Sequence, residues 1–571
     1  MHTDLPPRYG DVCAPQGHEN KSVTVLSSAE IDRSEWPLHA KRVDVLDLKE
    51  LELMETATPQ TIVNNSHALD WIQDPRRYDK VPVEAARKAP WTALTSDQIR
   101  QLIETGIIEE ILPGEVLGGV RVFLVAEPSK RRFRVIKCPE LINFFLGRDT
   151  LMKLDMATKA QIIGLVHKGS FGAEYDFSSF FDQFELRYDI SRRQCFKKGR
   201  KWYRLCRGAM GQRQMVEVAH TTTKKLADFP GRECATEAVI DNVAFVGGSG
   251  ADSGPVLRDA ERFLERVRRV NGTLNGDTSD PMSLISTKMV FCGVELDFTD
   301  KTVRMTQKVL EKLRLSHGNR AGWTRRNLAA HFGLLFWAVG LVVVNPGDYF
   351  DALKFYAGVC RAFSLLEDPL GGDFWEEPAG ADGAAEQALI AWTECVLQNV
   401  PRKVPPPRNG EPVDWIVCVD SCASGWGYVA VDGLSGETRA HGERWTRDFR
   451  ALHSHQLHQS VFTEPHGAFN TACHLLSHSG RLQRVHFMTD SVATQTGGNK
   501  GFNARSATIN DVLVRLRRTF PAEFFEFSFE HLPGTSNTVA DYLSRGKAVS
   551  SDLMEGAAAA MRAHPLLGGG S

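Results

Sequence analysis

Two short stretches decide the fold of the central part of the chain: EYDFSSFFDQF at residues 174–184 and AVIDNVAFVGG at residues 238–248. The first carries Asp176 where a strand turns into a run of aromatic and small residues. The second is an apolar hairpin interrupted by Asp241 and Asn242. Burying such a polar pair is costly unless a cation or a partner satisfies it. The two stretches therefore predict strand ends whose carboxylates meet at one edge of a sheet.

Domain boundaries follow from changes in periodicity. The chain has 571 residues, which at ~100–200 residues per domain predicts several folded units. Regular structure becomes clear near Trp91, with a helix starting at Ser96 and then a hairpin at residues 120–137. We expect an N-terminal extension at 1–90, a mixed region at 91–300, a helical region at 301–400, a Pro-rich linker at 401–412, an α/β domain at 413–546 and a linker-like tail at 547–571.

Charge is distributed unevenly along the chain. The formal net charge is only −2, which by itself argues against a polyanionic partner. Residues 119–225, however, contain 22 Lys and Arg against 10 Asp and Glu, so this segment carries +12 and the rest carries −14. Binding of a polyanion depends on the local electrostatic field in one groove and not on the total charge of the chain. This segment is therefore a candidate nucleic-acid surface. Its densest part, residues 192–204, is equally typical of an exposed hairpin turn around KKGRK.

Composition excludes several classes of protein. The eleven cysteines include no C-x-x-C pair, which disfavours a disulfide framework and a zinc knuckle and favours a reducing compartment. The longest apolar run, residues 332–344, has 13 residues, fewer than the ~18–20 that cross a bilayer. The first residues do not resemble a secretory signal. We therefore expect an intracellular protein of the cytoplasm or nucleus without a membrane partner.

A second set of carboxylates lies in the predicted C-terminal domain. Asp420 ends the expected strand WIVCVD, Glu464 opens an expected helix, and Asp490 ends the expected strand VHFMTD. Asp541 follows in HLPGTSNTVADYLSR at residues 531–545. Carboxylates at the ends of elements can face a common cleft, and two divalent cations held there support phosphoryl chemistry. The pattern predicts a second metal site on a different scaffold.

The order of the central motifs resembles that of retroelement reverse transcriptases. Residues 120–143 look like the fingers strands, YDFSSFF like the first catalytic motif, RGAMGQ like the L-P-x-G turn, IDN like the Y-x-D-D turn, and STKMVFCGVELDF like the lysine-containing and primer-grip region. The match covers residues 91–365. It implies an α+β right-hand polymerase with fingers, palm and thumb, which copies an RNA or DNA template from a DNA primer and dNTPs. It also implies two Mg²⁺ ions, or Mn²⁺ in their place, in each active site.

The resemblance assigns roles residue by residue. Asp176 and Asp241 would hold the metals, with Asn242 beside them. The remaining roles are Lys130 and Arg134 for the triphosphate, the Phe177 carbonyl beside the metals, Phe181 as the gate against a ribose 2′-OH, Met210 and Gly211 for the nucleotide pocket, and Lys288 as proton donor to pyrophosphate.

The sequence departs from the family pattern at three positions. Val239 stands where the family has Tyr, Asn242 replaces the second Asp, and Ala209 stands where a Pro is usual. An amide offers one carbonyl oxygen to a cation but brings no negative charge. We therefore expect a lower metal affinity or rate than an aspartate at position 242 would give.

The C-terminal motif resembles retroelement RNase H. His531, Asn537 and Asp541, at spacings of 6 and 4, match H-x-P-G-x-x-N-x-x-A-D. The resemblance implies an α/β RNase H-like domain that cleaves the RNA strand of an RNA–DNA hybrid and uses the Asp-Glu-Asp-Asp set to bind metals. His531 would assist release of the cleaved phosphate or move protons, and Asn537 would belong to the substrate site. The spellings of IDN, GAMGQ and the last motif look most like tyrosine-recombinase (DIRS/VIPER-type) retrotransposons.

Each motif also has an interpretation without catalysis. D-F-S-S is typical of a helix cap, and Asp241-Asn242 is typical of a hairpin turn. His453, His455 and His458 form an H-x-H-x-x-H cluster that suits zinc or copper but lacks a completing ligand nearby, and a polar connector is the alternative. The amide at position 242 also fits a domesticated, catalytically weakened RNA-binding protein. A chain whose only activity is RNase H is a further alternative.

Overall fold

The computed structural model describes residues 36–127, 130–147, 150–366, 372–381, 383–407, 411–477 and 479–567. These residues form two compact units. The first unit comprises residues 36–43, Ile72–Thr150 and Phe184–Met215, and the second comprises Asp44–Trp71, Leu151–Gln183 and the chain from Val216 onward. The predicted turn residues Pro128 and Ser129 lie outside the described residues.

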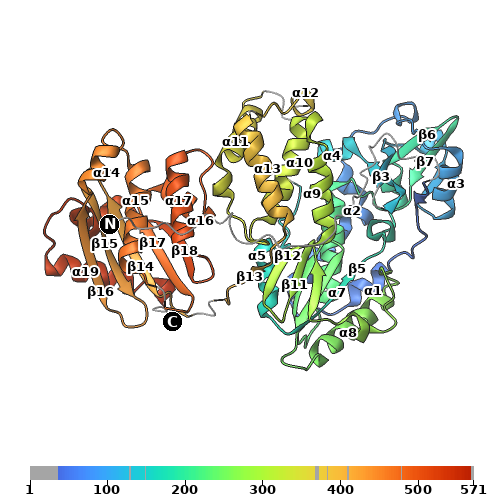
Figure 1. Ribbon diagram of the computed structural model, residues 1–571. Helices are drawn as coiled ribbons and strands as arrows, with labels where there is room; N and C mark the ends of the chain where they lie inside the picture. Colours follow the sequence, from blue (N-terminus) through green and yellow to red (C-terminus); the bar gives the residue numbers. More distant parts are fainter. Residues whose placement is uncertain are drawn as a thin grey trace, which may run out of the picture. The chain divides into compact units, whose positions relative to one another are not determined.

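The first unit contains two three-stranded sheets, with strand orders β1-β4-β3 and β2-β7-β6. Figure 1 labels β3, β6 and β7 of these sheets. The predicted hairpin is confirmed, because β3 and β4 pair antiparallel over seven residues each. The elements of this unit are β1 (Leu38–His39), α3 (Ser96–Glu104), β2 (Ile108–Ile111), β3 (Arg121–Glu127), β4 (Arg132–Cys138), α4 (Glu140–Leu146), α6 (Tyr188–Ser191), β6 (Cys195–Lys198) and β7 (Lys201–Leu205).

Helix α3 starts at Ser96, as predicted, and the residue before it caps the helix. Thr95 is the N-cap: its side chain accepts from the Gln98 backbone N–H at 3.2 Å, and the Gln98 side chain accepts from the Thr95 N–H at 2.9 Å. This capping box satisfies two of the N–H groups that a helix start leaves without partners. Ile99 and Leu102 then face the core, as their helical spacing predicted.

The second unit contains a small antiparallel sheet of order β5-β9-β8. In this sheet the two stretches that carry Asp176 and Asp241 lie side by side. Helix α8 covers it through Phe263, whose ring lies 5.5 Å from that of Phe245 and 5.4 Å from that of Tyr175. The elements are α1 (Leu48–Leu53), α2 (Pro59–Gln73, whose last two residues belong to the first unit), α5 (Lys159–Gly164), β5 (Phe171–Asp176), α7 (Arg213–Ala227, which starts in the first unit), β8 (Ala235–Val239), β9 (Asn242–Gly247) and α8 (Gly254–Arg269).

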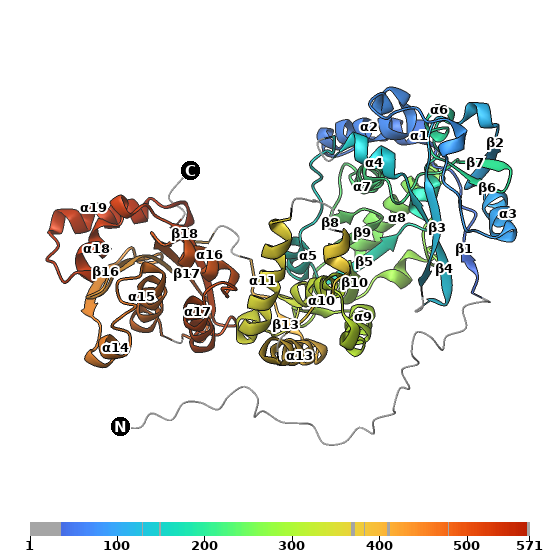
Figure 2. The ribbon, with the colours of Figure 1, turned by 90° about the horizontal axis from the view of Figure 1, so that it is seen from above.

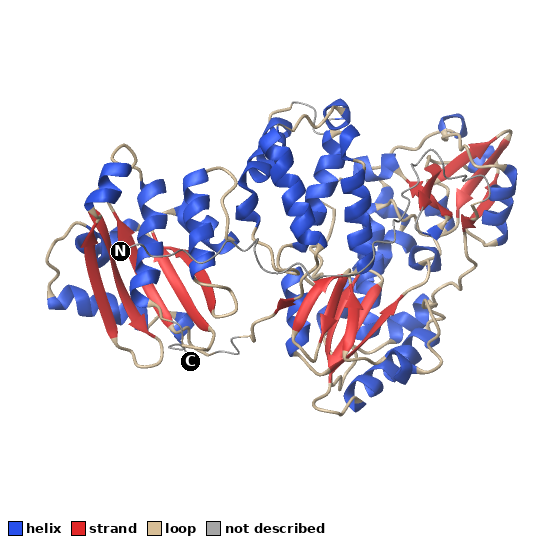
Figure 3. Ribbon diagram, viewed as in Figure 1, coloured by secondary structure: helices blue, strands red, loops and turns tan. Residues whose placement is uncertain are grey.

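A second antiparallel sheet and a group of helices follow, with one shared core (Figure 3). The sheet has the order β10-β11-β12-β13, and its last strand comes from the segment predicted as a linker. Phe332, at the start of the long apolar run, stacks on Tyr356 and meets Trp392 edge-on, so this run is core rather than membrane span. The elements are β10 (Lys288–Phe291), β11 (Val294–Asp297), β12 (Thr302–Met305), α9 (Gln307–Gly318), α10 (Arg325–Ala338), α11 (Phe350–Ser364), α12 (Gly372–Glu376), α13 (Gly383–Leu397) and β13 (Arg402–Lys403).

The C-terminal domain, residues 411–567, is a five-stranded mixed sheet between two layers of helices (Figure 2). Strands run in the order β16-β15-β14-β17-β18, with antiparallel pairs on one side of β14 and parallel pairs on the other. One face packs on α15 and the other on α18 and α19. The elements are β14 (Trp415–Ser421), β15 (Gly425–Asp432), β16 (Thr438–Arg444), α14 (Arg447–Leu452), α15 (Ser460–Leu475), β17 (Gln483–Thr489), α16 (Val492–Lys500), α17 (Ala507–Thr519), β18 (Phe525–His531), α18 (Thr538–Ser544) and α19 (Ser551–Arg562).

Two segments predicted to lie outside the folded domains are packed. Within residues 36–90, Leu51, Ile72 and Tyr78 are fully buried, so regular structure starts well before Trp91. Helix α19 belongs to the segment predicted as a linker-like tail, and its Ala558 is fully buried against the C-terminal sheet. Both predictions failed because these short helices become stable through tertiary burial rather than through their own periodicity. None of the helices in the described part of the chain is long and apolar enough to cross a bilayer.

Candidate functional site

Asp176 and Asp241 lie at adjoining ends of paired strands. Asp176 is the last residue of β5, and its cross-strand partner is Asn242, the first residue of β9. Asp241 occupies the two-residue turn between β8 and β9, and its carbonyl accepts a 2.9 Å hydrogen bond from the Phe177 N–H. The structure therefore brings the two predicted carboxylates of the first constellation to one sheet edge, and Asp241 also lies in a hairpin turn, as the alternative interpretation predicted.

The turn that carries Asp241 is strained. Ile240 has φ 55°, a left-handed conformation that a β-branched residue rarely adopts. Its N–H donates to Nδ1 of the buried His220 at 3.3 Å. Next to it, the Asn242 amide donates to Oδ1 of Asp241 at 3.0 Å. The residue that replaces an aspartate therefore acts here as a hydrogen-bond donor to the carboxylate beside it.

Asn275 is a site residue that no sequence motif identified. Its Nδ2 donates to Oδ2 of Asp176 at 2.8 Å and lies 3.3 Å from the Phe177 carbonyl oxygen, and its backbone N–H donates to the Asp176 carbonyl at 2.8 Å. One amide thus joins two of the oxygens that the family resemblance assigned to metals. A local sequence signal could not reveal it, because Asn275 is 99 residues from Asp176 in a loop.

Glu174 adds a third carboxyl group on the same face of β5 as Asp176, since side chains two residues apart on a strand share a face. Burial, reinforced by the charge of Asp176, raises the pKa of Glu174 to about 7. Near neutral pH this strand end is therefore partly protonated. The alternation of side chains along the strand would have identified Glu174, but only the residue at the strand end was predicted.

The aromatic residues after Asp176 take different positions. The Phe177 ring is buried and stacks on Phe180, with ring centroids 4.2 Å apart, while its backbone carbonyl faces Asn275. Phe181, the predicted gate against a 2′-OH, is half-buried in the short 3-10 turn that follows. The D-F-S-S segment therefore enters a turn, and Phe181 keeps an accessible surface.

Lys288, the predicted proton donor, is engaged elsewhere. Its Nζ forms a 2.8 Å ion pair with Asp297, its cross-strand partner on β11, and the hydrogen bond to Asp297 raises the pKa of Lys288. The side chain is 60 % exposed, so the ion pair is a weak surface contact. In this structure Lys288 thus stays a protonated group whose partner is Asp297.

The predicted nucleotide-binding residues of the first unit form a second group. The Arg134 Nη1 lies 3.8 Å from the Met210 sulfur, and its Nη2 pairs with Glu127 at 2.7 Å. Gly211 donates to the Lys137 carbonyl at 3.0 Å, and a Cβ at this glycine would lie 2.5 Å from that oxygen. A side chain at position 211 would therefore push the turn off β4. Lys130, also in this unit, is exposed two residues before β4.

Most of the densest basic run is a hairpin, as the alternative interpretation predicted. Strands β6 and β7 pair Lys198 with Lys201 around Gly199, which has φ 60°. Lys201 forms an ion pair with Glu110 at 2.7 Å, and Lys197 lies over the Trp91 ring at 4.9 Å and donates to a backbone carbonyl. Because these cations already have partners, the net charge of this run overstates the field that it offers to a polyanion.

The second constellation converges in the C-terminal domain. Asp420 lies near the end of β14, Glu464 on α15 and Asp490 directly after β17. Among the described residues they form one of two groups whose ligand atoms all lie within 4.8 Å of one another. Glu464 is one turn inside its helix rather than at its start, because α15 begins at Ser460. Three predicted ligands from three separate elements are thus brought together.

Burial makes this cluster electrostatically costly without a cation. Burial raises the pKa of Asp420 to about 6. The Ser544 hydroxyl, which donates to Asp420 Oδ2 at 2.6 Å, acts in the opposite direction and lowers this pKa. Burial raises the pKa of Glu464 to about 9, with the charges of Asp420 and Asp490 adding to the effect. Glu464 also accepts from the Ser421 N–H at 3.2 Å and from the Thr489 hydroxyl at 3.3 Å. At neutral pH the metal-free cluster therefore holds at least one proton.

Asp541, the fourth predicted ligand, is placed differently. It lies on α18, and its Oδ1 accepts from Arg545 Nε at 2.7 Å, one turn along the same helix. It does not belong to the 4.8 Å group of described carboxylates, although its charge contributes to the raised pKa of Asp420. The sequence motif therefore located Asp541 near the cluster, and Arg545, four residues on, has the helical spacing at which opposite charges pair.

Of the other two predicted residues of the C-terminal motif, Asn537 is buried and His531 is exposed. Asn537 is 2 % exposed and donates from Nδ2 to the Val419 carbonyl at 2.9 Å, so it fixes the motif loop to β14 next to Asp420. His531 ends β18 opposite Thr489 and is exposed. A Cβ on Gly534 of the following loop would lie 3.2 Å from Asp490 Oδ2, so this loop borders the carboxylates.

The H-x-H-x-x-H cluster does not assemble as a metal site among the described residues. The His453 ring packs on Phe449 and Phe462, with centroids 4.8 and 4.9 Å away, and its Nδ1 contacts the Gln456 side chain. The cluster is the polar connector that the alternative interpretation predicted.

Comparisons with known proteins give distant likenesses only. No protein-family model matches the chain, and no curated protein matches it. The solved structures that resemble it include the foamy viral protease-reverse transcriptase with dsDNA, at 12 % identity and TM-score 0.42, covering 84 % of this chain and 96 % of the other. The same viral protein with an RNA/DNA hybrid is similar at 12 % identity and TM-score 0.42, covering 84 % and 62 %. At this distance, the reaction has to be inferred from the side chains themselves.

Proposed function

We propose that the chain is an RNA-directed DNA polymerase of a retroelement that also copies DNA and carries an RNase H activity. The observation that carries the proposal is the pairing of two carboxylate sites. Asp176 and Asp241 adjoin at one sheet edge, and Asp420, Glu464 and Asp490 converge within 4.8 Å. Both donor sets are all-oxygen, which suits Mg²⁺, with Mn²⁺ as its alternative.

The residues of both sites fit divalent cations. Asp420 and Glu464 have pKa values raised to about 6 and about 9, so the buried cluster lacks a positive charge that would let both groups ionise. In the first site, Asp176 Oδ2 and the Phe177 carbonyl both accept from the side-chain amide of Asn275. A cation in the place of that amide would contact the same two oxygens. When bound, two Mg²⁺ would activate the attacking oxygen and stabilise the leaving oxygen.

The chain's own residues would position the reactants. In polymerisation, a primer 3′-OH attacks the α-phosphorus of a dNTP and pyrophosphate leaves. We assign the triphosphate to Arg134 and Lys130, the nucleotide pocket to Met210 and Gly211, and the exclusion of a 2′-OH to Phe181. Lys288 would donate a proton to pyrophosphate after it leaves Asp297. In cleavage of the hybrid, His531, next to the loop that borders Asp490, would assist release of the cleaved phosphate or move protons.

Within retroelements, we propose a tyrosine-recombinase (DIRS/VIPER-type) origin, on the spelling of the IDN, GAMGQ and HLPGTSNTVADYLSR motifs. The partners would be an RNA template, a DNA primer and its product, dNTPs and the RNA–DNA hybrid. The amide at Asn242 supports a second candidate, a catalytically weakened RNA-binding protein or a chain whose only activity is RNase H. The retained cluster of Asp420, Glu464 and Asp490 favours an active enzyme over a binding scaffold.

Primer extension on poly(rA)/oligo(dT) tests the polymerase. We expect extension with Mg²⁺ or Mn²⁺ that Asp176→Asn abolishes, since the carboxylate charge is needed to hold the cation. No extension by the parent chain in either metal would refute the polymerase and leave the second candidate.

Cleavage of a labelled RNA–DNA hybrid tests the nuclease. Asp490→Asn should abolish cleavage and leave extension largely intact, because the two sites use separate carboxylates. Cleavage that persists in this variant would refute the RNase H assignment.

A further inference from the structure

A second group of metal-ligating side chains lies in the C-terminal domain. His486 comes from β17, Glu530 from β18, and His564 lies between α19 and the turn Pro565–Leu567. Of the described residues, these three form the other group whose ligand atoms all lie within 4.8 Å of one another. His486 is four residues before Asp490, or ~13 Å along an extended strand, so this group is separate from the carboxylate cluster.

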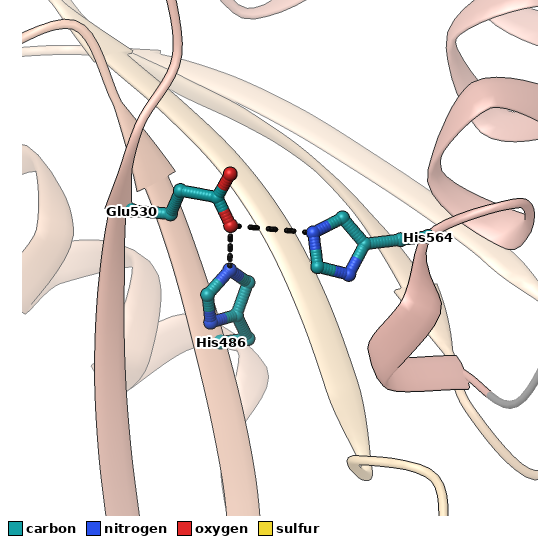
Figure 4. Close-up of side chains that lie close together, drawn as sticks. All are labelled: His486, Glu530 and His564. Atoms are coloured by element: carbon teal, nitrogen blue, oxygen red, sulfur yellow. Dashed lines mark hydrogen bonds and ion pairs between the residues drawn. The ribbon is translucent and has the colours of Figure 1, made fainter.

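The three side chains converge on one point (Figure 4). The Nε2 atom of His486 lies 3.1 Å from Oε2 of Glu530, and the Nε2 atom of His564 lies 3.3 Å from the same oxygen. Two ligands of a tetrahedral zinc ion, with bonds of ~2.0–2.1 Å, are ~3.3–3.4 Å apart. Both spacings therefore come within a few tenths of an ångström of the edge of a zinc coordination tetrahedron.

The donor types select the metal. Two imidazoles and one carboxylate suit Zn²⁺, whereas Mg²⁺ prefers oxygen alone. His486 is buried, and its Nδ1 lies 2.8 Å from the Ser528 hydroxyl, which orients the ring from outside the site. The Glu530 side chain is 49 % exposed, which gives an ion a path in and leaves a fourth position for water.

We propose that His486, Glu530 and His564 form a zinc-binding site that fastens the C-terminal turn to the sheet. Another contact already holds this turn against the domain, because the Val413 N–H donates to the Leu566 carbonyl at 3.0 Å. Ala558 of α19 is fully buried in the same core. A metal held by β17, β18 and the turn would therefore tie α19 to the domain.

Without metal, the group is a hydrogen-bonded clasp. The Leu566 N–H donates to His564 Nδ1 at 3.2 Å, so a neutral ring carries its proton on Nε2 and donates it to Glu530. Zinc binding requires a free Nε2, so the ring proton moves to Nδ1 and the Leu566 hydrogen bond is lost. The two ring–Glu530 hydrogen bonds are then exchanged for metal bonds. The one long neutral hydrogen bond that is lost outright is worth much less than a zinc–imidazole bond, so the exchange favours the metal.

Metal titration of the full chain tests the site. After chelation and dialysis, Zn²⁺ and Co²⁺ are titrated with excess Mg²⁺ present to occupy the carboxylate cluster. We expect one equivalent to bind, the Co²⁺ complex to show visible d–d absorption without a thiolate charge-transfer band, and Zn²⁺ to raise the Tm. His486→Gln and His564→Gln should weaken binding at least ~10-fold and remove the Tm shift.

Two further variants keep the test decisive. Glu530→Gln retains an oxygen that accepts from both rings, so it preserves the clasp and the fold while lowering zinc affinity. His455→Gln, in the exposed connector, is the matched histidine control and should bind like the parent. Equal affinity in all variants, a thiolate band from the free cysteines, or no zinc binding by the parent chain would overturn the proposal; the last result would leave the hydrogen-bonded clasp alone.

Discussion

The Asn275 side chain donates a 2.8 Å hydrogen bond to the carboxylate of Asp176, across 99 residues of sequence. The same nitrogen lies 3.3 Å from the Phe177 carbonyl. Asp176 is therefore oriented from a loop outside the family motifs. A neutral amide orients the carboxylate without cancelling the negative charge that would hold a cation.

Removing this contact should slow primer extension. We expect Asn275→Ala to lower extension by about 10-fold, because partners that orient a metal ligand are worth ~10–100-fold in metal affinity or activity. Asn275→Asp should be worse, since it sets a like charge beside Asp176. The exposed Asn327→Ala is the matched control. An increase in activity for Asn275→Ala would mean that the amide competes with the cation.

Asn242→Asp should raise extension at saturating Mg²⁺, because it adds a negative charge next to Asp241. The Asn242 amide donates to Asp241 Oδ1 at 3.0 Å, so the same change replaces a hydrogen bond by repulsion in the metal-free protein. We expect a loss of about 1 kcal/mol in the free energy of unfolding without metal, recovered when Mg²⁺ is added. Extension rates and thermal unfolding with and without Mg²⁺ measure both effects. An unchanged or lower rate would show that the site is adapted to the amide.

Mg²⁺ binding to the C-terminal cluster should release protons. Burial raises the pKa of Glu464 to about 9, and Mg²⁺ needs the ionised carboxylate, so apparent affinity should increase about tenfold per pH unit between pH 7 and 8.5. Titration calorimetry in buffers of different ionisation enthalpy counts the protons. Glu464→Gln should bind more weakly and lose the pH dependence in this range. A pH-independent affinity in the parent chain would contradict the prediction.

The helical region should lose stability in acid through His331. This residue is fully buried between Ser316 and Thr393, and burial lowers its pKa to about 4. The unfolded chain binds the proton near pH 6.5, so the stabilisation is complete above that pH and is lost as the pH falls towards 4, by up to about 3 kcal/mol. Urea unfolding at pH 7.5 and 5.0 should show a smaller difference for His331→Gln than for the parent or His455→Gln. Equal differences would exclude His331 as the cause.

Local sequence determined the parts of the fold that depend on periodicity. The strand-to-turn change at Asp176 and the polar pair at Asp241 in an apolar hairpin predicted strand ends, and the structure pairs the two strands because the hydrophobic pattern sets the register of β5 against β9. The helix near Ser96 and the hairpin of β3 and β4 were predicted within a residue or so for the same reason. Asp420, Glu464 and Asp490 were chosen by residue type and motif order, and the structure brings them together.

Tertiary structure alone decided which groups face these carboxylates. The contact of Asn275 with Asp176 and the meeting of His486 with His564 depend on a loop and a packed tail that bring distant residues together. Their neighbours in sequence carry no pattern, because such contacts arise from burial summed over the whole core rather than from local propensity. The sequence by itself therefore determined where acidic chemistry resides, and the packing decided how each charge is oriented, neutralised or left for a metal.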